Sequence, residues 1–395
     1  MNQDYIDDWW VFPGFKIERV LSGLKLPVNI AFVPNPGDRK EDPLFYFTEL
    51  YGQVKVATKD YTVHTYAENL LDYEPTREFP GSGESGVIGI CVEPITGDLF
   101  ISLVYKENGD TKAKIVRTSS RNGLKMDSWE NIIDNMPSTL RSHQIQAVTI
   151  GPDSKLYINN GDGGAAGKAQ DVNDLRGKIL RLNLDGSIPW DNPYPENPVF
   201  AMGLRNSFGG VWRKSDNRLY ISDNGPHKDD RLAKIEPYGN YGWPGDMRKG
   251  SMFWWHHTQS PTALDFMQGG QFPPQFNDHL FVALFGNTYS EGRVDGKGKR
   301  IVKMELNPQV TAVKSYDDFV IYTGKGPATP CGLAFGPDGL YFSDLHGEKD
   351  SGGNIYKISL DPGKLKELID YGKEDLYPGF WIELQSWAKA KGMTV

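Results

Sequence analysis

Two polar residues, His143 and Asp162, lie where predicted strands begin and end and could together carry acid–base chemistry. His143 directly precedes one predicted strand, and Asp162, in the turn NGDGG, directly follows the next. Neighbouring antiparallel strands begin and end at the same edge of a sheet, so the two side chains are expected close together. A carboxylate that fixes the tautomer of an imidazole makes it a general base. The alternative is a structural histidine, because a lone histidine is an unspecific signal.

An arginine and an amide, Arg205 and Asn206, follow an apolar stretch on another predicted loop. A half-buried guanidinium suits a planar carboxylate or a developing oxyanion. The alternative is a structural ion pair with Asp229 or Asp230, which follow in the same region. The sequence leaves both interpretations open.

A sharp turn at Asn224, Gly225 and Pro226 ends a further predicted strand. Backbone carbonyls at such a turn can point outward and coordinate a hard cation such as Ca²⁺. Zinc is not expected, because the chain has no His/Cys spacing typical of a zinc site. The adjacent imidazoles of His256 and His257 alternate in direction if they lie on a strand, so only one of them can face a pocket.

Internal repeats predict the elements that position these residues. Each unit contains an apolar triplet, a turn such as Pro-Asp-Gly, a Leu-Tyr-Ile type of strand and later a Gly-x-Ile-x-Lys/Arg strand. The third triplet residues, with spacings of 60, 58, 61, 55 and 69 residues, are Phe32, Val92, Ile150, Val211, Phe266 and Phe335. Six units of blade length with short alternating strands predict an all-β fold, a six-bladed β-propeller. A pair of β-sandwiches is the alternative, which the near-regular period disfavours.

We expect the propeller to span residues 15–360 and a short C-terminal helical tail, residues 361–395, to pack on it. In this tail, residues 364–370 and 380–391 have helical character. Polar insertions that would wall a pocket over the central channel, if they gather on one rim, are residues 74–84, 161–175, 245–259 and 287–299.

Composition excludes several classes of function. The 395 residues carry a net charge of −8 without blocks of like charge, so nucleic acid is not an expected partner. A membrane span is not expected, because no run of about 18 apolar residues occurs. The acidic start has no apolar secretion signal, so the protein is either cytoplasmic or has lost a signal. The two cysteines, Cys91 and Cys331, do not make a disulfide framework.

Several motifs together make the chain resemble the glucose/sorbosone dehydrogenase family, the soluble quinoprotein sugar dehydrogenases, over about residues 20–358. These motifs are GVIG after Glu84, His143 before Gly-Pro-Asp, GDGG around Asp162, RGKILRLNLDGSIP at 176–189, GLRN at 203–206, NGP at 224–226 with Asp230, and GNYGWP at 239–244.

The resemblance implies a propeller that binds pyrroloquinoline quinone (PQQ) and Ca²⁺ and oxidises a sugar or a related polyol or aldehyde. It implies that His143 is the general base for the sugar hydroxyl and that Asp162 is its partner. Arg205 would lie against the quinone oxygens. The carbonyls of Gly225 and Pro226 would bind Ca²⁺. The residues that would line the cofactor region are Glu84, Arg205, Asn206, Asn224 and Asp230.

The sequence departs from the family where its glucose-oxidising members hold PQQ with a lysine on blade five and two arginines on blade six. In this chain Gly286 stands near the lysine position, and residues 328–331 (ATPC) contain no arginine. Lys325 and Arg300 are candidates to replace these cations. If they do not, the alternative is a redox-free lactonase, lyase or isomerase in the same pocket. The expected partner is in either case a small-molecule sugar or sugar derivative.

Overall fold

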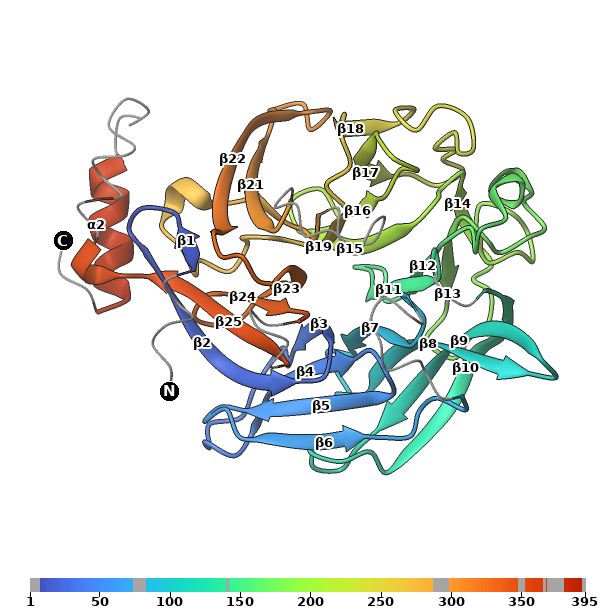
Figure 1. Cartoon of the computed structure of the whole chain (residues 1–395), viewed down its shortest axis with the longest axis horizontal. Coiled ribbons are helices and arrows are strands. Elements are labelled where there is room, and N and C mark those ends of the chain that lie inside the picture. The colour runs from blue at the N-terminus through green and yellow to red at the C-terminus, as the bar shows by residue number, and fades with distance from the viewer. Residues whose placement is uncertain are drawn as a thin grey trace.

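The computed structural model describes residues 8–73, 83–139, 142–286, 298–346, 352–364, 367 and 380–392. Its strands form six antiparallel sheets arranged as blades around one axis (Figure 1). The fold is therefore the six-bladed β-propeller that the repeats predict. Of the predicted insertions, residues 74–82 and 287–297 lie outside the described residues.

The strands of each blade follow one another from the central axis outward. Blade one holds β3 (Pro27–Phe32), β4 (Pro43–Glu49), β5 (Gln53–Thr58) and β6 (Val63–Ala67). Blade two holds β7 (Val87–Val92), β8 (Leu99–Glu107), β9 (Asp110–Ser119) and β10 (Ser128–Pro137). Blade three holds β11 (Ile145–Ile150), β12 (Leu156–Asn160), β13 (Lys178–Leu182) and β14 (Val199–Met202).

The other three blades follow the same plan. Blade four holds β15 (Ser207–Arg213), β16 (Arg218–Asp223), β17 (Asp230–Ile235) and β18 (Ser251–Trp255). Blade five holds β19 (Pro261–Phe266), β20 (Leu280–Leu284), β21 (Arg300–Leu306), β22 (Val313–Tyr322) and β1 (Trp9–Val11). Blade six holds β23 (Pro330–Phe335), β24 (Leu340–Asp344), β25 (Gly353–Leu360) and β2 (Phe15–Leu24).

The repeat residues fall at matching places in the blades. Five of them end the innermost strand of their blade: Phe32, Val92, Ile150, Phe266 and Phe335. The sixth, Val211, lies inside β15. The strands next to the innermost ones, such as β12 and β24, are buried along their whole length because neighbouring blades cover both of their faces.

The N-terminal part of the chain closes the ring. Strand β2 pairs with β25 at the outer edge of blade six, with Phe15 opposite Leu360. Strand β1 precedes the predicted start at residue 15 and adds to the outside of blade five. Phe15 packs edge to face against Phe272 and Phe319 between these blades, and each buried phenyl ring contributes about 1.5–3 kcal/mol. The closure therefore rests on packing as well as on strand pairing.

The C-terminal helix α2 (Phe380–Ala390) lies outside the ring, as Figure 1 shows. Its Leu384 and Ala388 are buried, and Trp387 Nε1 donates to Gly270 O at 3.1 Å. Of the first predicted helical segment, residues 365–366 and 368–370 lie outside the described residues.

A cavity of about 240 Å³ lies between the innermost strands of all six blades. None of the candidate site residues lines this central channel. Those residues lie at or beyond the ends of the strands. Among the described residues, no helix has the length and apolarity to cross a membrane.

Candidate active site

The predicted acid–base pair of the site is His143 with Asp162. His143 lies just before β11 and Asp162 just after β12, so both occupy the same end of blade three. The His143 Nδ1 atom lies 2.6 Å from Asp162 Oδ1. The His143 side chain is 15 % exposed, whereas that of Asp162 is 2 % exposed. The structure thus brings the predicted pair together, with the imidazole as the reachable part.

Three donors hold the carboxylate of Asp162. Besides His143, Gly164 N donates to Oδ1 and Trp243 Nε1 donates to Oδ2, each at 2.8 Å. Burial alone would raise the pKa of Asp162, but these hydrogen bonds outweigh it and hold the pKa below its usual value. Trp243 lies in the turn between β17 and β18. Sequence reasoning missed its role.

The main chain of His143 is held in a strained conformation. Its φ of 58° lies in the left-handed region, which costs a non-glycine residue about 1–2 kcal/mol. Gly163 N donates to His143 O at 3.0 Å. A Cβ on Gly161 would lie 2.3 Å from the same carbonyl, so only glycine allows this close approach.

Glu84 lies beside this segment, three residues before β7. Its Oε2 accepts from His143 N at 2.9 Å and from Gln146 Nε2 at 3.0 Å. Its Oε1 accepts from Asn206 Nδ2 at 3.1 Å. Burial raises the pKa of Glu84, whereas these donors favour its charged form. The predicted residues Glu84, Asn206 and His143 therefore form one connected network.

Arg205 lies just before β15, the innermost strand of blade four. Its Nη1 donates to Asn224 O at 2.9 Å and to Gly225 O at 2.8 Å, and its guanidinium lies 5.5 Å from the centre of the Trp243 ring. Burial lowers the pKa of Arg205. Among the described residues it forms no ion pair, so the structural pair with Asp229 or Asp230, the alternative from the sequence, is not present.

A buried ion pair that sequence reasoning missed lies behind Arg205. Arg231 and Asp223 have fully buried side chains, and Arg231 Nη2 lies 2.6 Å from Asp223 Oδ2. Asp223 Oδ1 accepts from the backbone N–H of Arg205 at 3.1 Å and of Asn206 at 2.8 Å. The sequence signal was weak, because Arg231 follows two aspartates and precedes the apolar Leu232 and Ala233.

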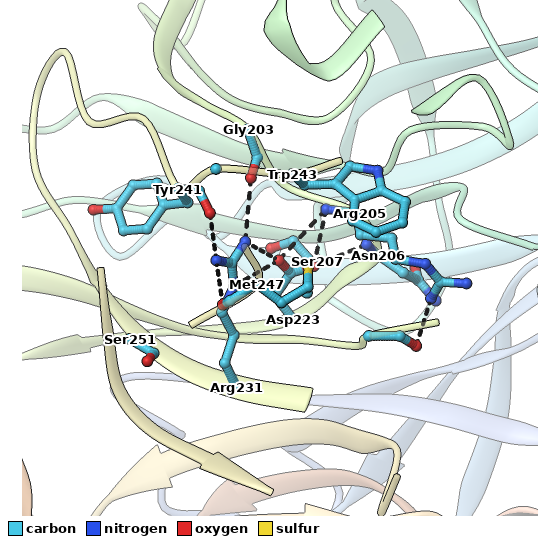
Figure 2. Close-up of polar contacts among 12 residues, drawn as sticks. Gly203, Arg205, Asn206, Ser207, Asp223, Arg231, Tyr241, Trp243, Met247 and Ser251 are labelled. Carbon is cyan, nitrogen blue, oxygen red and sulfur yellow. Dashed lines mark hydrogen bonds and ion pairs between the residues drawn. The ribbon is translucent and has the colours of Figure 1, made fainter. Parts of the chain in front are cut away.

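Arg231 also binds backbone carbonyls of two other segments (Figure 2). Its Nη1 donates to Tyr241 O at 2.5 Å and Met247 O at 2.7 Å, and its Nη2 donates to Gly203 O at 3.2 Å. This one guanidinium therefore joins the loop before Arg205 to the turn that carries Trp243.

Asp230, a predicted cofactor contact, is fully buried, and its carboxylate accepts hydrogen bonds from loop residues. Its Oδ1 accepts from Gly225 N at 2.8 Å. Its Oδ2 accepts from Thr258 Oγ1, Gln259 N and Ser260 N at 2.7–2.9 Å. These contacts fix the turn that carries Gly225. The two histidines of the nearby insertion, His256 and His257, are both exposed.

The predicted metal ligands lie on that turn. The carbonyl of Gly225 accepts from Arg205, and the side-chain Oδ1 of Asn224 is buried without a hydrogen-bond partner in the described part of the chain. A Cβ on Gly225 would lie 2.0 Å from Lys228 O, so the tight turn requires glycine. In the described ranges, no group of three or more His, Cys, Asp or Glu residues could hold a metal. A cation at this turn would depend on carbonyl and amide oxygens, which suit Ca²⁺.

The corresponding ends of blades five and six carry different residues. Ala328, Thr329 and Cys331 are buried, and Thr329 Oγ1 donates to Phe285 O at 2.6 Å. The two candidate replacement cations are not alike. Arg300 Nη1 lies 3.0 Å from Asp318 Oδ1 in an ion pair, whereas Lys325 is exposed between β22 and β23.

Comparison with known proteins now decides the family. The sequence profile described as "Glucose / Sorbosone dehydrogenase" matches residues 24–324. This chain belongs to the glucose/sorbosone dehydrogenase family. The match covers blades one to four and most of blade five, which include every predicted catalytic, cofactor-binding and metal-binding residue but not Lys325.

Two curated relatives have names that describe sugar dehydrogenases. Quinoprotein glucose dehydrogenase B of Acinetobacter calcoaceticus is 32% identical over 195 residues, which are 41% of this chain and 40% of that protein. The aldose sugar dehydrogenase of Escherichia coli is 25% identical over 309 residues, 70% of this chain and 78% of that protein. The match thus spans less than half of the first relative and more than three quarters of the second.

Solved structures share this fold over most of the chain. The E. coli aldose sugar dehydrogenase in its apo form gives a TM-score of 0.72 at 21% identity, covering 88% of this chain and 100% of that one. The PQQ-bound aldose sugar dehydrogenase of Streptomyces coelicolor gives 0.65 at 21% identity, covering 89% and 100%. At these identities the likeness establishes the fold.

Proposed function

We propose that this member of the family oxidises a hydroxyl of a sugar or a related polyol, with His143 as the general base. The observation that carries the proposal is the 2.6 Å contact between His143 Nδ1 and Asp162 Oδ1. This contact keeps the ring proton on Nδ1, so Nε2 carries the lone pair that accepts a proton. No contact or comparison favours a redox-free lactonase, lyase or isomerase.

The bond changes assign a task to each residue. An O–H bond and a C–H bond break at one carbon, and a C=O bond forms. Nε2 of His143 takes the hydroxyl proton, and the carboxylate of Asp162 stabilises the resulting imidazolium. PQQ, when bound, supplies the two-electron acceptor for the hydride. The imidazole, 15 % exposed, then returns its proton to solvent.

Arg205 supplies fixed positive charge beside this pair. Carbonyl oxygens and the Trp243 ring hold its guanidinium, and no carboxylate in the described part of the chain neutralises it directly. A preorganised cation in a half-buried site stabilises negative charge that develops during reaction. Arg205 is therefore the electrostatic partner of His143 in this proposal.

The residues of blades three and four fit the family's cofactors. The unpartnered Oδ1 of Asn224 and the carbonyl of Gly225 are oxygens of the kind that Ca²⁺ prefers. These atoms and the Pro226 carbonyl would hold Ca²⁺. Arg205 and Asn206 would contact PQQ. Asp230 would act indirectly, by fixing the turn.

The carboxylates of PQQ would meet few fixed cations in this chain. Hydrogen bonds to charged groups contribute about 1.5–3 kcal/mol each. At the positions where family members carry cations, this chain has Gly286 and residues 328–331. Lys325 is the exposed candidate to compensate, so we expect PQQ to bind more weakly to this chain and to depend strongly on Ca²⁺.

Reconstitution tests the proposed function. Apo-protein is titrated with PQQ, with Ca²⁺ or with chelator, while the quinone absorbance is followed and a panel of neutral aldoses is added. We expect saturable binding that requires Ca²⁺ and bleaching of the quinone by at least one aldose. Absence of binding with PQQ in large excess, at saturating Ca²⁺, would refute the proposed cofactor and with it the reaction.

A further inference from the structure

Two carboxylates reach His143 by different routes. Asp162 holds the imidazole ring, whereas Glu84 Oε2 accepts the backbone N–H of His143 at 2.9 Å. The second contact is unusual because the N–H belongs to a residue with a φ of 58°. A conformation that costs about 1–2 kcal/mol persists only where the surroundings hold it.

The carboxylate of Glu84 is itself fixed by two amide side chains. Gln146 is fully buried and donates to Oε2 at 3.0 Å, and Asn206 is 3% exposed and donates to Oε1 at 3.1 Å. The backbone of Asn206 is held in turn by Asp223, at 2.8 Å. A continuous series of hydrogen bonds therefore runs from the Asp223–Arg231 ion pair in blade four to the main chain of His143.

This series sets where the imidazole lies. The left-handed backbone of His143 directs its side chain toward Asp162 across the blade end, and Gly163 N holds the carbonyl of the same residue at 3.0 Å. Both sides of the strained residue are thus fixed, the N–H by Glu84 and the C=O by Gly163. Without the Glu84 acceptor, the N–H loses its partner and the backbone can relax to an ordinary conformation.

We propose that Glu84 is a positioning residue, which holds the main chain of His143 so that the imidazole meets Asp162. The inference rests on the proposed function of His143. It assigns Glu84 a task other than the cofactor contact that the family resemblance implies. Glu84 acts through its hydrogen bond to the backbone and does not touch the reacting atoms.

Two substitutions at Glu84 separate geometry from charge. Glu84→Ala removes the acceptor, whereas Glu84→Gln keeps a side-chain oxygen for the His143 N–H. The new NH₂ group of glutamine would face Asn206, whose side-chain amide can turn over to accept from it. Glutamine should therefore rescue the position that alanine loses.

Glu93 provides a matched control at the other end of strand β7. It is also a buried carboxylate that accepts backbone N–H groups, those of Ile95 at 2.9 Å and of Thr96. Glu93→Ala and Glu93→Gln lie far from the site and should leave the imidazole of His143 unchanged. They show what the loss of a buried carboxylate does to stability alone.

The first readout needs neither cofactor nor sugar. In ¹⁵N-histidine-labelled apo-protein, the His143 resonance is assigned by its loss in His143→Ala, and its tautomer is measured. We expect the Nδ1–H tautomer in wild type and Glu84→Gln, and a mixture of tautomers in Glu84→Ala. A folded Glu84→Ala protein with the wild-type tautomer would overturn the proposal. If Glu84→Ala does not fold, a tautomer mixture in Glu84→Gln with intact folding would overturn it equally.

Turnover is the second readout. A displacement of about 1 Å costs about 100-fold in rate, so Glu84→Ala should lose about 100-fold in kcat with a smaller change in KM. Glu84→Gln should stay within about threefold of wild type, because the acceptor is kept. Equal losses in both variants would contradict a positioning role. If wild type shows the expected tautomer but oxidises no sugar, the proposed function fails while the positioning inference stands.

Discussion

The site side of blades three and four and the corresponding side of blades five and six differ in how their residues are held. On the side of blades three and four, neighbouring residues hold the proposed catalytic groups. Half-buried Trp243 donates to Asp162, and buried Asp223 accepts from the backbone of Arg205. Buried Gln146 donates to Glu84, which accepts from the backbone of His143. On the side of blades five and six, buried Ala328 and Cys331 stand at the rim instead. The difference teaches that the groups proposed for proton transfer are held in place by their neighbours, whereas the proposed anionic cofactor would meet few fixed cations.

Buried cations explain how the first half is preformed. Arg231 joins segments of blade four, and Lys178 Nζ in blade three donates to the carbonyls of Lys168, Ala169 and Arg176 at 2.6–3.1 Å. Lys178 binds carbonyls of the loop that follows Asp162, and Arg231 binds carbonyls of the turn that carries Trp243. Burial lowers the pKa of Lys178 to about 8. Lys178 and Arg231 thus fix the backbone from buried positions. Arg205 also donates to backbone carbonyls, but among the described residues it has no carboxylate partner, and we propose it as the cation for the ligand.

The largest expected effect is on proton transfer. His143→Ala should lower kcat/KM by about 10⁴-fold, at the upper end for loss of a general base, because no other described side chain can take the proton at this place. The melting temperature should stay near that of wild type, since the imidazole is partly exposed. Steady-state kinetics and calorimetry measure both. A variant that keeps a tenth of the activity would show that the chemistry lies elsewhere on the rim.

The next largest effect is on stability, through the buried Asp223–Arg231 ion pair of blade four. Arg231→Met leaves the Asp223 carboxylate buried without its cation, which should lower the free energy of unfolding by about 3–5 kcal/mol. The double variant Asp223→Asn/Arg231→Met should recover part of this loss, because the buried charge is gone. Denaturant unfolding measures the difference. A loss of less than about 1 kcal/mol in the free energy of unfolding of the single variant would mean that this ion pair does not stabilise blade four.

A comparison of two arginines sharpens the contrast between the two walls. Arg205→Met should weaken PQQ binding by tenfold or more, about 1.5–3 kcal/mol for a charge-assisted contact. Arg300→Met should have little effect on PQQ, because Arg300 is already paired with Asp318. Absorbance titrations at fixed Ca²⁺ give both dissociation constants. Equal weakening by the two substitutions would show that blade five also holds the ligand.

The smallest effect should appear in blade five, as stability and not as activity. Burial raises the pKa of Asp265 to about 6, above its ordinary value. Its favourable contribution is complete at acidic pH, below the ordinary value, and is lost as the pH rises through about 6, where the buried carboxyl ionises. Asp265→Asn should therefore stabilise the protein by about 1–2 kcal/mol at pH 8 and leave it unchanged near pH 3.5.

Unfolding curves of Asp265→Asn and wild type at the two pH values measure this effect. Asparagine keeps an acceptor oxygen for Phe335 N, which donates to Asp265 at 2.8 Å. Turnover should be unchanged. The same stabilisation at both pH values would show that ionisation of Asp265 is not the cause.

The fold could be predicted because its signal is local. Each blade repeats the same short apolar triplets and turns, and the repeat residues Phe32, Val92 and Ile150 end matching strands. The partnership of His143 with Asp162 is nearly as local, because the two residues flank neighbouring strands of one blade. Strand alternation and the shared sheet edge were enough to place them together.

The supporting residues could not be predicted because their contacts depend on how loops run across the closed ring. Trp243 reaches Asp162 from another blade, and Gln146 reaches Glu84 between blades two and three. The spacing of these residues along the chain does not indicate such contacts. Arg231 gave no clear signal, because it follows Asp229 and Asp230 in the sequence, although a buried charge requires partners. The sequence did not reveal that most of these partners would be backbone carbonyls.

The most direct test of the account is a single-turnover reduction measured with an aldose that carries deuterium at its anomeric carbon. Protein loaded with PQQ and Ca²⁺ is mixed with the labelled or the unlabelled sugar, and the loss of quinone absorbance is followed. We expect one reduction of the quinone per site, and this reduction should be severalfold slower with the deuterated sugar. In His143→Ala the reduction should be abolished although PQQ remains bound. Bound quinone that the sugar does not reduce, or reduction that persists without His143, would contradict it.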